Sequence, residues 1–364
     1  MAKTPRAERR ATMKIRGEEV LLPTTIVGSY PRPIFMEGRV FPIGVDAAEF
    51  VDYRARELYK HCVELATKDM LDAGLDVITD GGQYYENETG YEYAELFHAM
   101  AHKLEGYAAY GDRIQVGAFD LPIYKPTVLG DVNWRRPVMK PAVEAVREST
   151  DAPLKVNVSL GPATLAALST DRHYGDIKAL SQDVARAYNE EFRDLERRGV
   201  DQIQITEPLT FFEPESWIIE AINTAFDGIS TYKVVHICYG HEEGQPGILD
   251  LKANRLFPWA FDINCDQIHF QMASHEFSEV DSLKGWPADK DLGVGVVDIE
   301  LLRVESPETI AGWMHRLFGV VSPEQVSMST DCGIASMRRN VAKAKLKAIV
   351  AGRDLARAQL NGHA

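Results

Sequence analysis

Residues 177–206 read IKALSQDVARAYNEEFRDLERRGVDQIQIT, a helical pattern that leads directly into a short strand pattern. Apolar residues recur every three or four positions up to about residue 198, as on one face of an amphipathic helix. In residues 202–206 isoleucine alternates with glutamine, which is typical of a strand. A helix followed by a strand is the repeating unit of α/β folds with a parallel sheet.

The same alternation recurs along the whole chain. Short strand patterns occur at 24–27, 76–79, 155–159, 202–206, 233–237, 267–272, 292–296 and 325–329. Helical periodicity fills most of the gaps, for example at 47–73, 177–198 and 307–318. Eight such units predict an α/β protein with a (β/α)8 TIM barrel, and a doubly wound parallel sheet is the structural alternative.

One long segment interrupts this pattern. Residues 84–150 are rich in Tyr, Gly and Pro, and we interpret them as an inserted hairpin and helical lid after strand two, over one barrel end. No Pro/Ser linker or internal repeat divides the chain. We therefore expect one (β/α)8 catalytic barrel at 21–364, with its insertion at about 84–150, after an N-terminal arm at 1–20.

Composition excludes several classes of function. The chain has 364 residues, and 45% of them are hydrophobic, as in ordinary globular proteins. Its net charge of −14 argues against nucleic acid as a partner. No run of apolar residues is long enough for a membrane span, and the basic N-terminus has no apolar signal region. Four scattered cysteines form no disulfide framework, so we expect a cytoplasmic protein. The arm is expected to be unstructured or to support homo-oligomer contacts.

A barrel places its chemistry at the carboxyl ends of its strands. Polar and turn-forming residues gather at those ends, while the strands themselves are apolar. The ends read GSY at 28–30, DGGQ at 80–83, GP at 161–162, EP at 207–208, HIC at 236–238 and DCG at 331–333. This contrast in polarity predicts a functional site there.

Three of these residues suit a metal ion. His236 and Cys238 are two apart at the end of a strand, so their side chains point the same way. Cys332 ends the eighth strand, and a barrel brings it across the mouth to the same point. One imidazole and two thiolates favour zinc, and the alternative is simple packing of small apolar side chains.

Three protein ligands with an open fourth position are typical of a catalytic zinc site. The ion would lower the pKa of a thiol substrate and hold it as the nucleophilic thiolate. Alkyl transfer to sulfur is the reaction that this arrangement predicts.

Five motifs carry a resemblance to a known family. TTIVGSYPRP at 24–33, DVITDGGQ at 76–83, QIQITEP at 202–208, VHICYGH at 235–241 and STDCG at 329–333 resemble the catalytic barrel of cobalamin-independent methionine synthase. They come in the same order and span most of the chain. The resemblance implies a (β/α)8 barrel with Zn²⁺ held by His236, Cys238 and Cys332.

The chain departs from the family pattern at four positions. Gly82 and Thr206 stand where the family has acidic residues that hold the ammonium of homocysteine. Gln271 replaces a glutamate zinc ligand, and Glu300 aligns with a family histidine. An ammonium buried without a carboxylate costs several kcal/mol, so the departures favour a thiol without an amino group.

One branch of the family fits these departures, the epoxyalkane:coenzyme M transferases. In the implied reaction, a zinc-bound coenzyme M thiolate opens an aliphatic epoxide, the small alkyl donor, to a 2-hydroxyalkyl thioether. The first alternative is a short cobalamin-independent methionine synthase that transfers methyl to homocysteine. The second is a non-catalytic zinc- or thiol-binding barrel.

The resemblance also suggests roles for individual residues. Ser29, in the turn after Gly28, is expected to receive the anionic end of the substrate. His269 is an alternative fourth ligand if Gln271 does not contact zinc, but we favour a histidine satisfied within the barrel interior. The predicted substrate-binding residues are Ser29, Gln271, Thr206 and Glu207. The predicted catalytic residues, which include the proton donor, are Glu300, Tyr239 and His241, and Tyr84 and Tyr85 are further candidates for that donor.

Overall fold

The computed structural model describes residues 12–36, 53–84, 100–108, 113–116, 119–208, 210, 215–239 and 253–362. Its centre is a six-stranded parallel sheet in the order β13-β12-β11-β10-β9-β7. The strands are β7 (Lys155–Val158), β9 (Gln202–Thr206), β10 (Tyr232–Ile237), β11 (Gln267–Phe270), β12 (Asp291–Val297) and β13 (Val326–Thr330).

Two short extended segments close this sheet into a ring. Thr24 forms a parallel bridge with Met328 of β13, and Ile78 forms one with Leu154 just before β7. The two segments also meet each other, because the backbone N–H of Asp76 donates to the carbonyl of Thr24 at 3.1 Å. The eight predicted strand positions therefore form one ring, and the predicted (β/α)8 barrel is confirmed.

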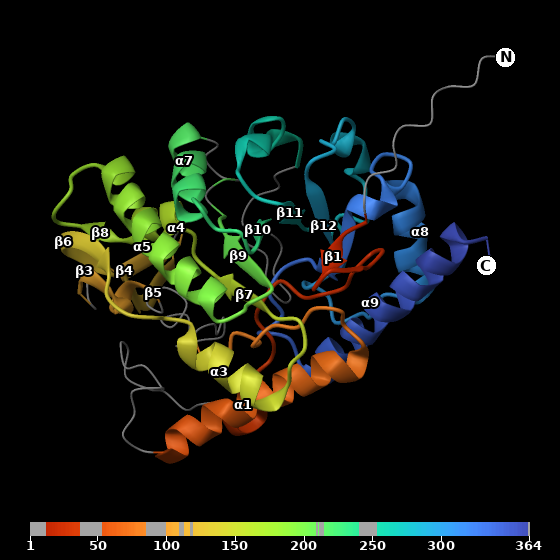
Figure 1. The fold of residues 1–364 in the computed structure, drawn as a ribbon, viewed down its shortest axis with the longest axis horizontal. Helices are drawn as coiled ribbons and strands as arrows, with labels where there is room; N and C mark the ends of the chain where they lie inside the picture. The colour runs from red at the N-terminus through yellow and green to blue at the C-terminus, as the bar shows by residue number, and fades with distance from the viewer. Residues whose placement is uncertain are drawn as a thin grey trace.

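Helices surround this ring (Figure 1). Two helices begin directly after a residue type that favours the N-cap position. Asp176 caps α5 by accepting from the backbone N–H of Lys178, and Ser306 caps α8 in the same way through Thr309. The α-helices are α1 (Tyr53–Ala73), α3 (Lys140–Ser149), α4 (Pro162–Leu168), α5 (Ile177–Arg197), α7 (Ser216–Ala225), α8 (Pro307–Leu317) and α9 (Arg339–Leu360). Short 3-10 helices are η1 (Ile34–Met36), η4 (Ala101–Lys103), η5 (Ala253–Arg255), η6 (Trp259–Asp262), η7 (Val280–Leu283) and η8 (Pro323–Gln325).

The insertion after the second strand position forms small antiparallel sheets at one side of the barrel, near α5 (Figure 1). Glu191 of α5 fixes it by accepting from Trp134 Nε1 and from the backbone N–H of Val138, both at 2.8 Å. Residues 85–99 of the predicted lid lie outside the described residues. The strands are β3 (Leu104–Ala108), β4 (Arg113–Val116), β5 (Phe119–Tyr124) and β6 (Thr127–Trp134), and β6 also pairs with β8 (Thr170–Asp171).

A hairpin covers the end of the barrel at which the strands begin. It consists of β1 (Lys14–Ile15) and β2 (Glu18–Glu19), joined through Arg16 and Gly17, both at positive φ. Arg16 Nε donates to Asp201 Oδ1 at 2.7 Å, just before β9. Residues 14–19 thus differ from the expected unstructured arm, because this ion pair and burial of Met13 hold them. Residues 1–11 lie outside the described residues.

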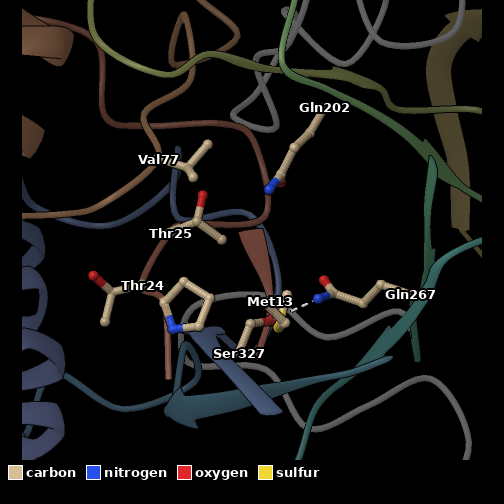
Figure 2. A pocket seen from close by; sticks show the side chains of 8 residues that line it. Met13, Thr24, Thr25, Val77, Gln202, Gln267 and Ser327 are labelled. Atoms are coloured by element: carbon tan, nitrogen blue, oxygen red, sulfur yellow. Dashed lines mark hydrogen bonds between the residues drawn. The ribbon is translucent and has the colours of Figure 1, made fainter. Parts of the chain in front are cut away.

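The inside of the barrel is polar. Apolar side chains such as Ile203 and Ile205 alternate along β9 with Gln202, Gln204 and Thr206. Figure 2 shows the level at which the strands begin, a pocket lined by side chains that include those of the first residues of β9 and β11. The lining residues are Met13, Pro23, Thr24, Thr25, Val77, Gln202, Gln267 and Ser327. This pocket lies at the end of the barrel opposite the predicted site.

Candidate metal centre

The structure brings the three predicted metal ligands together. His236 is near the end of β10, Cys238 follows that strand, and Cys332 follows β13. Cys332 Sγ lies 3.3 Å from His236 Nε2 and 3.3 Å from Cys238 Sγ. The candidate ligand atoms all lie within 4.8 Å of one another. Strand alternation and closure of the barrel therefore place these side chains as the sequence predicted.

The chemistry of this cluster suits a metal ion. One nitrogen and two sulfurs are a common donor set for zinc, and 3.3 Å between the sulfurs is too long for a disulfide. His236 is fully buried and Cys332 nearly so, whereas Cys238 is partly exposed. Among the described residues, no further His, Cys, Asp or Glu joins the group, which leaves a fourth position for another ligand.

His269 lies behind His236 rather than beside the cysteines. The Nδ1 atoms of the two imidazoles are 2.7 Å apart, and it is Nε2 of His236 that faces Cys332. In this arrangement His269 contacts His236, a candidate metal ligand, and does not face the position that a metal ion would take. Burial, with the nearby charges of His236 and Lys155, lowers the pKa of His269 well below its usual value.

Gln271 follows β11 on the same face as His269 and is buried. Its Nε2 donates to Ser274 Oγ at 3.0 Å, while its buried Oε1 accepts no hydrogen bond from a described residue. An amide oxygen left this way costs free energy unless a ligand satisfies it. Gln271 therefore keeps one polar atom available at the carboxyl end of its strand.

Ser29 lies next to the turn that carries Cys332. Its backbone carbonyl accepts from the N–H of Ile334 at 3.2 Å. Its buried Oγ has no hydrogen-bond partner among the described residues. A Cβ at Gly28 would lie 2.7 Å from Asn157 Nδ2, so only glycine fits this close turn. The turn therefore presents a buried hydroxyl donor at the barrel mouth.

Thr206 and Glu207 are neighbours in sequence but serve different contacts. Thr206 pairs with His236 across β9 and β10, and its hydroxyl donates to Asn157 Oδ1 at 2.9 Å. The Glu207 carboxylate accepts from the N–H of Ala163 at 3.1 Å and from the hydroxyl of Thr164, in the first turn of α4. Thr206 is thus placed beside the metal cluster, while these bonds tie Glu207 to a helix start.

Two of the three predicted catalytic residues, Tyr239 and Glu300, lie in the described part of the chain. Tyr239 follows Cys238, and burial raises the pKa of its hydroxyl well above 10, so it stays protonated. Glu300 is half-buried beyond β12, and its backbone N–H donates to Asp298 Oδ1 at 2.7 Å. His241 and Tyr85 lie outside the described residues.

A histidine that the sequence reasoning missed lies close to Tyr239. The ring centroids of His275 and Tyr239 are 6.2 Å apart, and His275 Nδ1 is 3.1 Å from Glu279 Oε1. The bond to Glu279 raises the pKa of His275, opposed in part by burial. The signal in the sequence was a His and a Glu four residues apart directly after the sixth strand pattern.

Two buried carboxyl groups complete the mouth. Asp331 accepts from the backbone N–H groups of Met272, Ala273 and Ser274, at 2.7–3.0 Å, and so joins the ends of β11 and β13. Burial raises the pKa of Asp331 to about 7 and that of Asp80, after the second strand position, to about 6.

Comparison with known proteins identifies the family of this chain. Residues 22–353 match the family described as the cobalamin-independent synthase catalytic domain. The chain belongs to this family. A methionine synthase of Saccharolobus solfataricus is 32% identical over 346 residues, which cover 93% of this chain and 96% of that protein. The family's enzymes transfer methyl or alkyl groups to thiols.

A second relative belongs to another branch of the family. The 2-hydroxypropyl-CoM lyase of Xanthobacter autotrophicus is 29% identical over 380 residues, which cover 96% of this chain and 98% of that protein. A B12-independent methionine synthase from Shewanella sp. W3-18-1, solved with selenomethionine, has the same fold. Its TM-score is 0.74 at 24% identity, and the match covers 94% of this chain and all of that one.

The described helices include none that is both long and apolar enough to cross a bilayer.

Proposed function

We propose that this member of the family is a zinc-dependent enzyme that alkylates a small thiol without an amino group, as an epoxyalkane:coenzyme M transferase. The observation that carries the proposal is Thr206. It lies beside His236 in the register of β9 and β10, at the position where the resemblance puts an acidic partner for an ammonium. A threonine there offers a neutral hydroxyl, already donated to Asn157.

The second expected acidic position supports the same conclusion. Gly82 has no side chain, and its φ of 63° is in the left-handed region that favours glycine. Two of the carboxylates at the mouth, Glu207 and Asp331, accept several hydrogen bonds from the protein itself. At the positions of Gly82 and Thr206, a buried ammonium would lack an acidic partner, at a cost of about 1–3 kcal/mol or more.

His236, Cys238 and Cys332 would hold the zinc, since their donor atoms converge and leave a fourth position for another ligand. Zinc in such a site lowers the pKa of a thiol and keeps it as thiolate near neutral pH. The expected partners are coenzyme M and a small alkyl donor. A reducing cytoplasm would keep the cysteines as thiols rather than disulfides.

The protein's own residues supply the other parts of the reaction. The Ser29 hydroxyl is a buried donor with no described acceptor, so we assign it to the sulfonate. During transfer a carbon–sulfur bond forms at the less hindered epoxide carbon, and the carbon–oxygen bond to that carbon breaks. The oxygen then takes a proton, for which we favour His275, held by Glu279.

A methionine synthase remains the second candidate, because the relative from Saccharolobus solfataricus carries that name at 32% identity. Asp80 is the carboxyl that could then receive the ammonium of homocysteine. A non-catalytic thiol-binding barrel would bind a thiol without forming product.

Binding of two thiols to a matched pair of variants tests the proposal. Thermal unfolding of the zinc-loaded protein is measured with coenzyme M or homocysteine. We expect protection by coenzyme M, and little by homocysteine. Thr206→Asp should strengthen homocysteine binding about tenfold or more, whereas the neutral Thr206→Asn should not, because a charged hydrogen bond contributes about 1.5–3 kcal/mol. Stronger protection of the unaltered protein by homocysteine would support the synthase instead.

A further inference from the structure

His269 is buried in the barrel, and its Nδ1 atom lies within hydrogen-bond distance of His236, one of the predicted metal ligands. His236 and His269 are register partners on the adjacent strands β10 and β11 (Figure 1). Their Nδ1 atoms are 2.7 Å apart, and both side chains are excluded from solvent. Two neutral imidazoles at this distance can share only one proton, so one ring donates and the other accepts.

The cysteines decide which ring donates. Nε2 of His236 lies 3.3 Å from Cys332 Sγ and faces the cluster. A metal ion there needs Nε2 without a proton, so His236 must carry its proton on Nδ1. His269 Nδ1 is then the acceptor, and the proton of His269 is on its own Nε2.

The interior of the barrel is built to leave room for the His269 ring. A Cβ at Gly293 would lie 2.7 Å from His269 Cδ2, so any larger residue on β12 would displace the imidazole. This glycine has an ordinary backbone φ, and its small size is therefore explained by the close ring rather than by a turn.

Polar atoms are available to His269 Nε2. Gln202, Gln267 and Ser327 line the pocket of Figure 2, and the residues two further along the same strands point the same way. Those residues are Gln204, His269 and Ser329, from alternate strands, as in one layer of a barrel interior.

Each member of this layer has one buried atom without a hydrogen-bond partner in the described part of the chain: Gln204 Oε1, His269 Nε2 and Ser329 Oγ. Two acceptors thus share a layer with the N–H that the proton assignment requires.

We propose that His269 is a positioning residue that accepts the Nδ1 proton of His236 and thereby holds His236 Nε2 toward the metal. Most histidine ligands are oriented by a carboxylate or a backbone carbonyl, and here a second imidazole takes that part. The inference rests on the proposed metal centre but not on which thiol the enzyme uses.

Zinc affinity of two variants of similar size tests this assignment. In His269→Asn the amide oxygen can still accept from His236, and in His269→Leu no acceptor remains. We expect His269→Leu to weaken zinc binding, measured by competition with a chelator, by about 10–100-fold, and His269→Asn to recover most of that loss. The absorption of the cobalt-substituted protein should change in the Leu variant and return toward normal in the Asn variant.

Ser327→Ala is the control for general disturbance of the interior, since it removes a polar group one layer away from His269. It should leave zinc affinity unchanged. Thermal unfolding of the metal-free proteins separates a folding defect from a loss of positioning.

Equal zinc affinity and cobalt spectra in the unaltered protein and His269→Leu would overturn the inference. So would equal losses in the Leu and Asn variants that match their losses of metal-free stability. Failure of the unaltered protein to bind zinc would instead overturn the proposed metal centre, and with it this role of His269.

Discussion

Cys332 and Cys265 are almost equally buried, and only their surroundings give them different roles. Burial raises the pKa of the Cys265 thiol to about 12, which fits a packed, neutral side chain. Cys332 instead lies 3.3 Å from both a histidine nitrogen and a second sulfur. From the sequence, Cys332 is expected to be a metal ligand because it ends a strand opposite His236.

Removing each of these cysteines should separate the two roles. Cys332→Ala takes away one of three metal ligands, so zinc affinity should fall by more than about 100-fold, beyond the effect of an outer partner. Cys265→Ala should bind zinc normally and lose only packing, about 1 kcal/mol of unfolding free energy. Zinc content after dialysis against a chelator measures the first effect. Full zinc retention in Cys332→Ala would contradict the assignment.

If His275 is the proton donor, catalytic activity should depend on pH in a definite direction. Its bond to Glu279 raises its pKa, so the protonated acid should persist to higher pH than in a free histidine. Activity should fall as pH rises through that raised pKa. Glu279→Gln should move this falling limb to lower pH. His275→Asn should lower kcat about 10²–10⁴-fold with little change in KM.

The same pair also affects stability. Since the folded pKa of His275 is raised, its contribution is complete below the unfolded value and is lost as pH rises through the folded one. Rate profiles from about pH 5 to 9 for the three proteins measure the effect on activity, and chemical denaturation over the same pH range measures the effect on stability. A falling limb that Glu279→Gln does not move would assign the proton donor elsewhere.

At the scale of single elements, α4 depends on a side chain from a neighbouring strand end. Glu207 accepts from the N–H groups of Ala163 and Thr164 and fills the space above Gly161, where a Cβ would meet its carboxylate. These bonds satisfy donors that a helix start otherwise leaves open.

Glu207→Gln should therefore destabilise the protein by about 1–3 kcal/mol, because a charged acceptor is lost at a buried helix start. Chemical denaturation measures this change, and titration with coenzyme M provides the control. An unchanged stability together with a lost affinity for coenzyme M would restore the substrate-binding role that the resemblance gave to Glu207.

The elements also show what the sequence could and could not predict. Periodicity predicted α5 and α8 to within a residue, and in the structure both helices begin directly after a capping side chain. The strand patterns at 24–27 and 76–79 were placed correctly, yet they form only isolated bridges. There the Asp76 carboxylate binds the backbone N–H of Thr24 at 2.8 Å, in place of a ladder bond.

Several other contacts between distant residues could not be predicted from the sequence. The pairing of β3 with β6 and the bond between His236 and His269 depend on which strands become neighbours. His275 was missed because its partner Glu279 acts through a turn and not through a periodic element. The convergence of His236, Cys238 and Cys332 could be predicted, because a spacing of two and two strand ends are visible along the chain.

At the scale of the whole molecule, the N-terminal hairpin and the candidate metal centre lie at opposite ends of the barrel. The hairpin of β1 and β2 closes the end where strands begin, and Arg16 holds it through Asp201 and the carbonyl of Asp151. The metal cluster lies where the strands end. This separation is usual in (β/α)8 enzymes.

Arg16→Ala should thus lower the unfolding free energy by up to about 1 kcal/mol, because an exposed guanidinium loses its paired bonds to Asp201. Zinc affinity and the Kd for coenzyme M should stay the same. Calorimetric unfolding and binding titrations on one preparation measure both. A change in zinc affinity without a change in stability would show that the two ends are coupled.

In the proposed function, His236, Cys238 and Cys332 form a metal centre that receives an amine-free thiol. Zinc X-ray absorption of the zinc-loaded protein, alone and with each thiol, tests it most directly, because it counts sulfur neighbours of the metal. We predict two protein sulfurs in the free enzyme and a third on addition of coenzyme M, with no such change for homocysteine at the same concentration. A third sulfur with homocysteine alone would contradict the account.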